Sequence, residues 1–279
     1  IPSLVNRSYI LDLSPDRSLL RYLAAEGLDT WLVDWDAPGT QEGSYRIEEY
    51  VQRLVRIRDD VIRTTGQTPM LAGYCMGGNL ALALAHVAPD RIAGLALLAT
   101  PWDFHAMQKG PTLMLAAMMP VLRQTIEVLG ELPVDVMQAM FSSRDPGGTI
   151  RKFRSFAKTD LDSDAAKAFI ALEDWLNDGV PLTRQVALEC LEGWYLENRP
   201  MQGRWEIAGR MVEPAKITVP SLLIVPLHDT IVPPESARPL AAQLPDAKMI
   251  ELDAGHIGMM AGSKAIDQLY APLAAWLRQ

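Results

Sequence analysis

Residues 70–88 read MLAGYCMGGNLALALAHVA, and this stretch decides the fold that the sequence predicts. A short apolar run ends at Gly73, a tight turn follows with Cys75 at its centre, and an apolar helical pattern begins directly after it. A strand, a sharp turn and a helix in this order are typical of a nucleophile elbow, in which backbone strain exposes the central side chain. Gly73 and Gly77 supply the small residues that let the backbones pass each other. The stretch therefore predicts an elbow with Cys75 as the nucleophile; the alternative is a buried structural cysteine beside a tight turn.

Short apolar runs alternate with helical patterns on both sides of this turn. The expected strands are Thr30–Val33, Met70–Ala72, Ile92–Ala99, Ser221–Val225 and Lys248–Leu252, with Ile1–Val5 as the tail of another. The expected helices are Ser18–Glu26, Ile47–Thr65 and Asn79–Ala88. Such alternation favours a mostly parallel sheet flanked by helices, so the predicted fold class is α/β. Because the chain opens at Ile1 in the middle of an apolar strand, we expect N-terminal strands of this fold to be missing from it.

The strand pattern stops after residue 103 and resumes at Ser221. Residues 104–215 read as helical, and six of the chain's 13 Met residues lie between Met107 and Met140. Methionine fills irregular cores and also forms adaptable surfaces for flexible apolar ligands, and the sequence leaves both uses open. We expect an α/β core of residues 1–103 and 216–279, interrupted by a helical cap of residues 104–215.

Composition excludes several classes of function. The 279 residues are 49% hydrophobic and 22% charged, as in ordinary globular domains. Lys and Arg number 26 against 34 Asp and Glu, and this net charge of −8 has the wrong sign for binding nucleic acid. The apolar run Leu113–Leu122 contains Pro120 and reaches only about half the length of a membrane span, so we expect no transmembrane helix.

The cysteines and histidines show no pattern of metal binding. The two cysteines, Cys75 and Cys190, are far apart, and the four histidines lack a metal spacing such as H-x-x-x-H. No G-x-G-x-x-G motif opens a helix. We therefore expect no metal and no bound cofactor. The low cysteine count and the lack of a leading apolar signal sequence favour the cytoplasm.

Two further residues fit the order in which an elbow nucleophile meets its partners. That order is the nucleophile, then an acid after a late strand, then a histidine after the last strand. The strand Ser221–Val225 leads to Asp229, and the strand Lys248–Leu252 leads to His256. Both residues then lie on loops at the carboxyl ends of strands, where an open parallel sheet presents its ligands. The predicted catalytic residues are Cys75, Asp229 and His256.

Other residues compete for these roles. His228 neighbours the acid but stands on the wrong loop to be the base. Asp103 follows an earlier strand, at a second position where such folds place the acid. We expect His86 to lie at the surface or in the last turn of its helix, and His105 to be a structural hydrogen-bonding residue. Asp34 and Asp36 are expected to order the loop around Trp35.

A cysteine nucleophile favours acyl transfer from a thioester. His256 takes the thiol proton, and Asp229 orients His256. The oxyanion lies against the amide of Met76 and one amide of the loop Val5-Asn6-Arg7, which we assign to Val5. A cysteine forms a thioester acyl-enzyme, and its formation from another thioester, such as an acyl-CoA, is close to isoenergetic. The chemistry leaves open whether water or an alcohol accepts the acyl group.

Six motifs resemble those of polyhydroxyalkanoate synthases, most closely the shorter synthases that work with a second subunit. They are Leu4–Leu13, Asp34-Trp35, Gly73–Gly78, Thr100–His105, Val232-Pro233-Pro234 and Gly255–Gly258. The resemblance implies an α/β-hydrolase fold with a mobile helical cap and no metal. It also implies polymerisation of (R)-3-hydroxyacyl-CoA through Cys-bound thioesters, with release of CoA. The implied partners are this substrate, a second synthase subunit and the surface of a polyester granule. An ester substrate and a homodimer are also compatible with the sequence.

The resemblance also implies roles for individual residues. The position matching Asp229 activates the incoming 3-hydroxyl group, and the position matching His256 activates Cys75. One departure is Thr230, because the family usually has His directly after the catalytic Asp. Two alternatives to a synthase-type acyltransferase therefore stay open. One is a Cys-dependent hydrolase of esters or acyl-CoA thioesters with the same three residues, and the other is a non-catalytic, granule-associated regulatory subunit.

Overall fold

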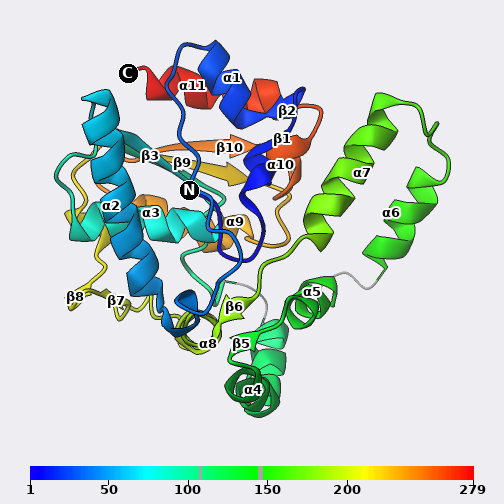
Figure 1. Cartoon of the computed structure of the whole chain (residues 1–279), viewed down its shortest axis with the longest axis horizontal. Helices are drawn as coiled ribbons and strands as arrows, with labels where there is room; N and C mark the ends of the chain where they lie inside the picture. The colour runs from blue at the N-terminus through cyan, green and yellow to red at the C-terminus, as the bar shows by residue number, and fades with distance from the viewer. Residues whose placement is uncertain (107–108, 144–146) are drawn as a thin grey trace.

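The computed structural model describes residues 1–106, 109–143 and 147–279. Within these residues the central sheet has four parallel strands in the order β10-β9-β4-β3 (Figure 1). The strands are β3 (Met70–Tyr74), β4 (Gly94–Leu98), β9 (Ser221–Pro226) and β10 (Lys248–Leu252). Since β4 pairs directly with β9, the chain before and after residues 104–215 forms one sheet. The α/β class and four of the predicted strands are thereby confirmed.

Helices cover both faces of this sheet (Figure 1). They are α1 (Leu19–Ala25), α2 (Ile47–Thr65), α3 (Met76–Val87), α9 (Pro234–Gln243), α10 (Gly258–Ala261) and α11 (Ala271–Leu277). α1 begins after Ser18, whose Oγ accepts a hydrogen bond from the Arg21 amide at 2.9 Å. α2 ends at Gly66, which adopts a φ of 72° that other residues reach only with strain. The three predicted helices are confirmed, with α3 starting at Met76.

The side chains of β4 divide between two hydrophobic clusters. Leu95 and Leu97 pack with residues of α2 and α3 on one face of the sheet. Ala96 and Leu98 pack with residues of α1 and α11 on the other face. Alternate residues of a strand point to opposite faces, so β4 is buried on both sides. This explains why its sequence is an unbroken apolar run.

Two expected strands are absent from the described residues. Thr30–Val33 has no strand pairing, so that prediction was wrong. Ile1–Val5 is not a strand either, although the Ile1 amine donates to the Ala72 carbonyl at 2.7 Å and the Ile1 carbonyl accepts from the Tyr74 amide at 3.0 Å. Ile1 thus lies beside β3, but the chain then leaves the sheet. A strand needs hydrogen-bonding partners along its length, and apolar composition alone does not supply them.

Residues 104–215 are mostly helical. Their helices are α4 (Lys109–Leu129), α5 (Val134–Ser142), α6 (Gly148–Phe156), α7 (Asp164–Asn177), α8 (Arg184–Leu188) and η3 (Glu189–Leu196). They also hold two short antiparallel pairs, β5 (Glu131–Leu132) with β6 (Leu182–Thr183) and β7 (Glu206–Ile207) with β8 (Arg210–Met211). Elsewhere in the chain the short elements are η1 (Ser8–Leu11), β1 (Asp12–Ser14), β2 (Arg17–Ser18), η2 (Glu42–Ser44) and η5 (Ile266–Tyr270), and η4 (Pro214–Lys216) lies at the end of residues 104–215. That residues 104–215 act as a cap stays a prediction.

The helix α4 is longer than the sequence analysis expected. It continues through Pro120, and its stretch Gly110–Leu129 has the length and composition of a membrane-crossing helix, with 22% of its most apolar window buried. Length and composition alone do not show that a helix crosses a membrane, so the expectation of no transmembrane helix stays a prediction, and only the expected length of the apolar segment was too short. The reason is that the less apolar residues after Leu122 continue the same helix. One face of α4 packs into the main hydrophobic cluster through Leu115, Met119, Leu122 and Ile126.

Candidate active site

Cys75 stands at the sharp turn between β3 and α3. Its φ of 55° and ψ of −127° are strained for a residue with a side chain, as a nucleophile elbow requires. The Cys75 amide donates to the Leu98 carbonyl at 2.8 Å, and its own carbonyl accepts from the Gly78 amide at 2.9 Å. These bonds on both sides hold the strained backbone in place. The Cys75 thiol is partly exposed, whereas Cys190 is buried.

The glycines of the turn are required by close backbone contacts. A Cβ atom on Gly73 would lie 2.4 Å from the Gly77 carbonyl oxygen. A Cβ atom on Gly77 would lie 2.2 Å from the Ile1 carbonyl oxygen and 2.6 Å from that of Pro2. The N-terminal segment therefore passes directly over the elbow.

His256 and Asp229 meet on adjacent loops beyond β10 and β9. Backbone hydrogen bonds from Leu227 to Leu252 and from His228 to Ala254 continue the pairing past the ends of the strands. This brings His256 Nδ1 within 2.6 Å of Asp229 Oδ2. The two side chains are 8% and 0% exposed, so the pair is shielded from water.

The other oxygen of Asp229 is also engaged. Asp229 Oδ1 accepts hydrogen bonds from the amides of Ile231 at 2.8 Å and Val232 at 2.7 Å. Both oxygens of the buried carboxylate therefore have partners within the protein. Such an arrangement fixes the carboxylate and, through it, the orientation of the His256 ring.

The charge state of His256 depends on Cys75 and Asp229. Burial lowers the pKa of His256, but the charge of Cys75 and the hydrogen bonds to Asp229 and Cys75 outweigh it and raise the pKa from 6.5 to about 10. His256 is thus stabilised as an imidazolium, the state that pairs with a cysteine thiolate. Tyr74 stacks on the ring with 5.0 Å between centroids and donates its hydroxyl hydrogen to the His256 carbonyl at 3.0 Å.

Cys75 and His256 open into a cavity of about 900 Å³. The nearby wall includes Val5 and Thr230, and the facing wall comes from α5, α6 and α7. Apolar side chains of that facing wall are Val134, Met137, Phe141, Phe153, Phe169 and Leu172. The cavity is therefore suited to an apolar ligand.

Two backbone amides near Cys75 are available, that of Val5 on the cavity wall and that of Met76, the residue directly after Cys75. The amides of Val5 and Met76 donate no hydrogen bond to another residue within the described part of the chain. Met76 is the first residue of α3, where the helix has no acceptor for its amide. The Val5 carbonyl, in contrast, accepts from the Val180 amide at 3.1 Å. The two free amides are those that the sequence analysis assigned to the oxyanion.

A family model described as the alpha/beta hydrolase fold matches residues 10–263. This chain belongs to the α/β-hydrolase family. The predicted fold is thereby confirmed, and Cys75, Asp229 and His256 follow one another in the chain order that this fold uses for nucleophile, acid and histidine.

Relatives of this α/β-hydrolase include poly(3-hydroxyalkanoate) polymerase subunits named PhaC. That of Haloferax mediterranei is 28% identical over 282 residues, which cover 99% of this chain and 57% of that protein. That of Allochromatium vinosum is also 28% identical and covers 99% of this chain and 79% of that protein. The chain thus spans less than two thirds of the Haloferax relative. It is a distant PhaC-like α/β-hydrolase, as the sequence motifs predicted.

Solved structures share the fold at lower identity. A monoacylglycerol lipase from Paleococcus ferrophilus is 20% identical with a TM-score of 0.61, covering 99% of this chain and 91% of that one. An esterase from Thermogutta terrifontis is 18% identical with a TM-score of 0.53, covering 94% and 85%. These likenesses concern the fold alone.

The competing candidates of this α/β-hydrolase have other partners. His228 is 69% exposed, and its Nε2 lies 2.9 Å from Oδ1 of the exposed Asp253. Asp103 Oδ1 accepts from the Asn198 side chain at 2.8 Å and from the His105 amide at 2.9 Å. These contacts give His228 a surface role and Asp103 a structural one.

The other candidates also have local contacts. His105 Nε2 lies 3.1 Å from the Leu196 carbonyl oxygen. His86 is partly buried, and this burial lowers the pKa of its imidazole. Asp34 Oδ1 accepts from the Asp36 amide at 3.2 Å, as expected of a loop-structuring residue. In the described ranges, no group of three His, Cys, Asp or Glu side chains is placed to hold a metal ion.

The methionine-rich stretch serves more than one use. Met119 and Met137 are buried in the main cluster, and Met137 also lines the cavity. Met114 and Met118 are exposed on α4. Met107 lies outside the described residues. Core filling thus occurs within this segment, and its use as an adaptable surface stays a prediction.

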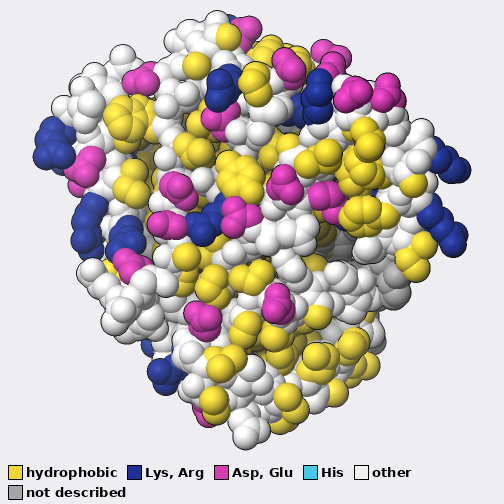
Figure 2. All heavy atoms as spheres, turned by 45° about the vertical axis from the view of Figure 1, so that its right-hand side comes forward, with side chains coloured by type: hydrophobic (Ala, Val, Ile, Leu, Met, Phe, Trp, Pro, Cys, Tyr) yellow, Lys and Arg dark blue, Asp and Glu magenta, His cyan; other side chains and the backbone are white. Residues whose placement is uncertain are grey.

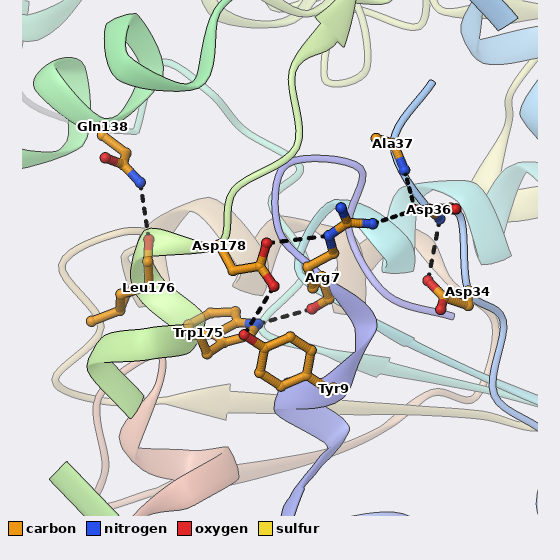
Figure 3. Close-up of polar contacts among 9 residues, drawn as sticks. All are labelled: Arg7, Tyr9, Asp34, Asp36, Ala37, Gln138, Trp175, Leu176 and Asp178. Atoms are coloured by element: carbon orange, nitrogen blue, oxygen red, sulfur yellow. Dashed lines mark hydrogen bonds and ion pairs between the residues drawn. The ribbon is translucent and has the colours of Figure 1, made fainter. Parts of the chain in front are cut away.

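Sequence reasoning missed two polar contacts at the cavity. Lys152 Nζ of α6 binds Glu173 Oε2 of α7 at 2.7 Å, and Glu173 Oε1 is buried without a partner among the described residues. Arg7 and Trp175 also line the cavity and belong to a network shown in Figure 3. Charged residues on a helical pattern normally read as a solvated face, so the sequence carried no signal for the contact of Lys152 with Glu173. The network of Arg7 and Trp175 joins residues far apart in the chain, which no local pattern reveals.

Proposed function

We propose that this chain is an acyltransferase that moves acyl groups from (R)-3-hydroxyacyl-CoA onto Cys75 and polymerises them with release of CoA. The observation that supports it best is the buried His256–Asp229 pair beside Cys75 at the mouth of an apolar cavity. The similarity to PhaC subunits over 99% of the chain supports the choice of substrate.

The first step forms a thioester on Cys75. The Cys75 Sγ attacks the carbonyl carbon of the acyl-CoA, and the oxyanion is stabilised by the amides of Val5 and Met76. When the carbonyl re-forms, the C–S bond to CoA breaks, and the CoA sulfur takes the proton from the His256 imidazolium. One thioester replaces another, so the acyl group keeps its reactivity.

The second step passes the acyl group from Cys75 to the 3-hydroxyl group of another 3-hydroxyacyl unit. His256, now neutral, removes the hydroxyl proton while the oxygen attacks the Cys75 thioester. An ester forms, and Cys75 leaves as the thiolate beside the His256 imidazolium. Asp229 acts through His256 in both steps, because its side chain is 0% exposed and both oxygens already have partners. This differs from the direct activation of the hydroxyl that the family resemblance implied.

Residues 104–215 act as a cap over this site. The support is that side chains of α5, α6 and α7 line the cavity that contains Cys75. Substrate entry then requires the cap to move, and closure excludes water that would hydrolyse the thioester. A crosslink between α7 and the N-terminal loop should suppress turnover; an unchanged rate with a verified crosslink would contradict this role.

The partners of the acyltransferase are a second synthase subunit or a second copy of the chain, and a polyester granule. Exposed apolar side chains on the outer face of α4, namely Leu113, Val121 and Val128, supply a surface for such contacts. Figure 2 shows hydrophobic side chains gathered at the end of the molecule where Figure 1 places α4. The location is cytoplasmic, at granules. Sedimentation with poly(3-hydroxybutyrate) particles tests this, and a Val121→Lys variant should bind them less.

Hydrolysis is the second candidate. The observation that favours it is Thr230 on the cavity wall, at the position where the resembling family usually has His. If the acceptor hydroxyl is not held at this position, water takes its place. The same three residues would then cleave esters or acyl-CoA thioesters.

The deciding experiment compares wild type with Cys75→Ala on (R)-3-hydroxybutyryl-CoA. The matched control is Cys190→Ala, because Cys190 is the chain's other cysteine, is buried and does not line the cavity. CoA release and the fate of the acyl group are measured together. Polyester formation that needs Cys75 but not Cys190 is the expected result. Release of free 3-hydroxybutyrate alone would establish the hydrolase, and granule or partner effects that persist in Cys75→Ala would favour a regulatory subunit.

A further inference from the structure

The loop that carries Val5 is attached to the helical segment rather than to the sheet domain alone. The Val180 amide donates to the Val5 carbonyl at 3.1 Å, and Asn6 forms an antiparallel bridge with Gly179. These contacts join residues more than 170 positions apart in the chain. The segment that follows α7 therefore fixes one side of the loop.

Arg7 reinforces this attachment through its side chain and its backbone (Figure 3). Its guanidinium binds Asp36 and lies 3.4 Å from Asp178 Oδ1. The Trp175 indole Nε1 donates to the Arg7 carbonyl at 2.8 Å. The Tyr9 hydroxyl donates to the second Asp178 oxygen at 3.1 Å. Arg7 thus contacts Asp36 of the core and also the end of α7 with the residue that follows it.

Two members of this network, Asp36 and Tyr9, have shifted pKa values. Arg7 binding lowers the pKa of Asp36, so this carboxylate stays ionised near neutral pH. Burial and the hydrogen bond to Asp178 raise the pKa of Tyr9 to about 12, so its hydroxyl remains a donor. Asp36 and Tyr9 therefore keep these protonation states in an assay near neutral pH.

The other end of the loop is held at the elbow. The Ile1 carbonyl binds the Tyr74 amide at 3.0 Å, and the Trp35 indole donates to the Pro2 carbonyl at 3.3 Å. Only the short stretch around Val5 lies between this anchor and Arg7. The position of the Val5 amide is consequently set by both anchors.

We propose that Arg7, Trp175 and Asp178 are positioning residues that hold the Val5 amide where the oxyanion forms. The oxyanion site is then complete only while the end of α7 is docked on the N-terminal loop. This inference rests on the proposed role of Cys75 as nucleophile. It adds that the helical segment contributes to catalysis through the loop and not only by covering the cavity.

Two probes of Cys75 separate this role from a general effect on the site. Iodoacetamide is attacked at carbon by Sγ while iodide leaves, so no oxyanion forms. Butyraldehyde adds to Sγ as its carbonyl electrons move to oxygen, and the oxygen takes the proton from His256 to give a hemithioacetal. Only the second reaction needs the oxyanion site. Neither probe requires acyl-CoA, so both reactions could still be measured if the polymerase proposal failed.

The variants are Arg7→Gln and Trp175→Phe, with Arg21→Gln as the matched control. Arg21 forms a comparable ion pair with Asp12 at 2.7 Å, also in the N-terminal part of the chain. Peptide mass spectrometry follows alkylation of Cys75, and protection by butyraldehyde gives its dissociation constant. Trp175→Phe removes a single donor while keeping an aromatic ring. It thus tests the network even if Arg7→Gln folds poorly.

We expect butyraldehyde to bind roughly tenfold more weakly to Arg7→Gln and Trp175→Phe, because a misplaced donor loses most of its effect. Alkylation by iodoacetamide should stay within about twofold of wild type, and Arg21→Gln should change neither quantity. Unchanged butyraldehyde affinity in both variants would overturn the proposal. An equal loss in both reactions would also overturn it, since that is the result of a merely structural contact.

Discussion

Replacing Asp229 by Asn should remove most of the activity, whereas the same change at Asp253 should not. Both residues are carboxylates bound to a histidine of a neighbouring loop, at 2.6 Å for Asp229–His256 and 2.9 Å for Asp253–His228. The pairs differ in burial, because the Asp229 side chain is 0% exposed and that of Asp253 is 61% exposed. Asp253→Asn is therefore a matched control for the chemistry of the substitution.

The magnitude follows from what an amide can satisfy. Asp229 accepts from His256 Nδ1 and from the amides of Ile231 and Val232. Asn has a single acceptor oxygen, so it cannot accept hydrogen bonds both from the two amides and from His256 Nδ1. If its oxygen faces the two amides, its NH₂ group faces Nδ1 and forces the His256 tautomer that cannot take a proton from Cys75. Breaking such a buried charged pair costs about 3–5 kcal/mol, against about 0–1 kcal/mol for the exposed pair.

Single-turnover CoA release and urea unfolding measure the two consequences. In Asp229→Asn we expect the acylation rate to fall roughly 10³–10⁴-fold, by analogy with triads in which the acid becomes an amide. In Asp253→Asn the rate should stay within about twofold and the free energy of unfolding within about 1 kcal/mol of wild type. Equal losses in the two variants would refute the reasoning, because burial would then not decide the role.

Three further predictions concern stability. Gly77→Ala should lower the free energy of unfolding by about 1–3 kcal/mol, since the new Cβ would stand 2.2 Å from the Ile1 carbonyl oxygen, whereas Gly43→Ala, with open space, should be nearly neutral in urea unfolding. The raised pKa of His256, about 10 against 6.5, implies that the stability from its protonation is complete below pH 6.5 and is lost as the pH rises through about 10. Unfolding measured across this range should show a decline that His256→Asn lacks; parallel curves would contradict the assignment. Lys152→Met should destabilise by about 1–3 kcal/mol, because it leaves the Glu173 side chain, 13% exposed, without its cation. Adding Glu173→Gln should then restore part of the thermal stability, and no recovery would show that the charge was not the cause.

Much of the site was predictable because its signals are local in the chain. The strand, the glycine-flanked Cys75 and the helix stand within 19 consecutive residues, and the backbone geometry of the turn requires this pattern wherever it occurs. Asp229 and His256 each follow a buried strand, so their loops were bound to reach the same edge of a parallel sheet. The same local reasoning failed for Thr30–Val33, because strand formation also needs a partner that the local sequence does not specify.

The sequence by itself thus determined the elbow, the order of the strands along the chain and the identity of the three candidate catalytic residues. Only the tertiary structure decided that His256 rather than His228 is buried against its acid, and that both Asp229 oxygens are engaged. It alone also brought Arg7 to Asp178, residues 171 positions apart. The physical reason is that burial and long-range contacts depend on how separate elements pack, whereas turns and helices follow from residues that are neighbours in the chain.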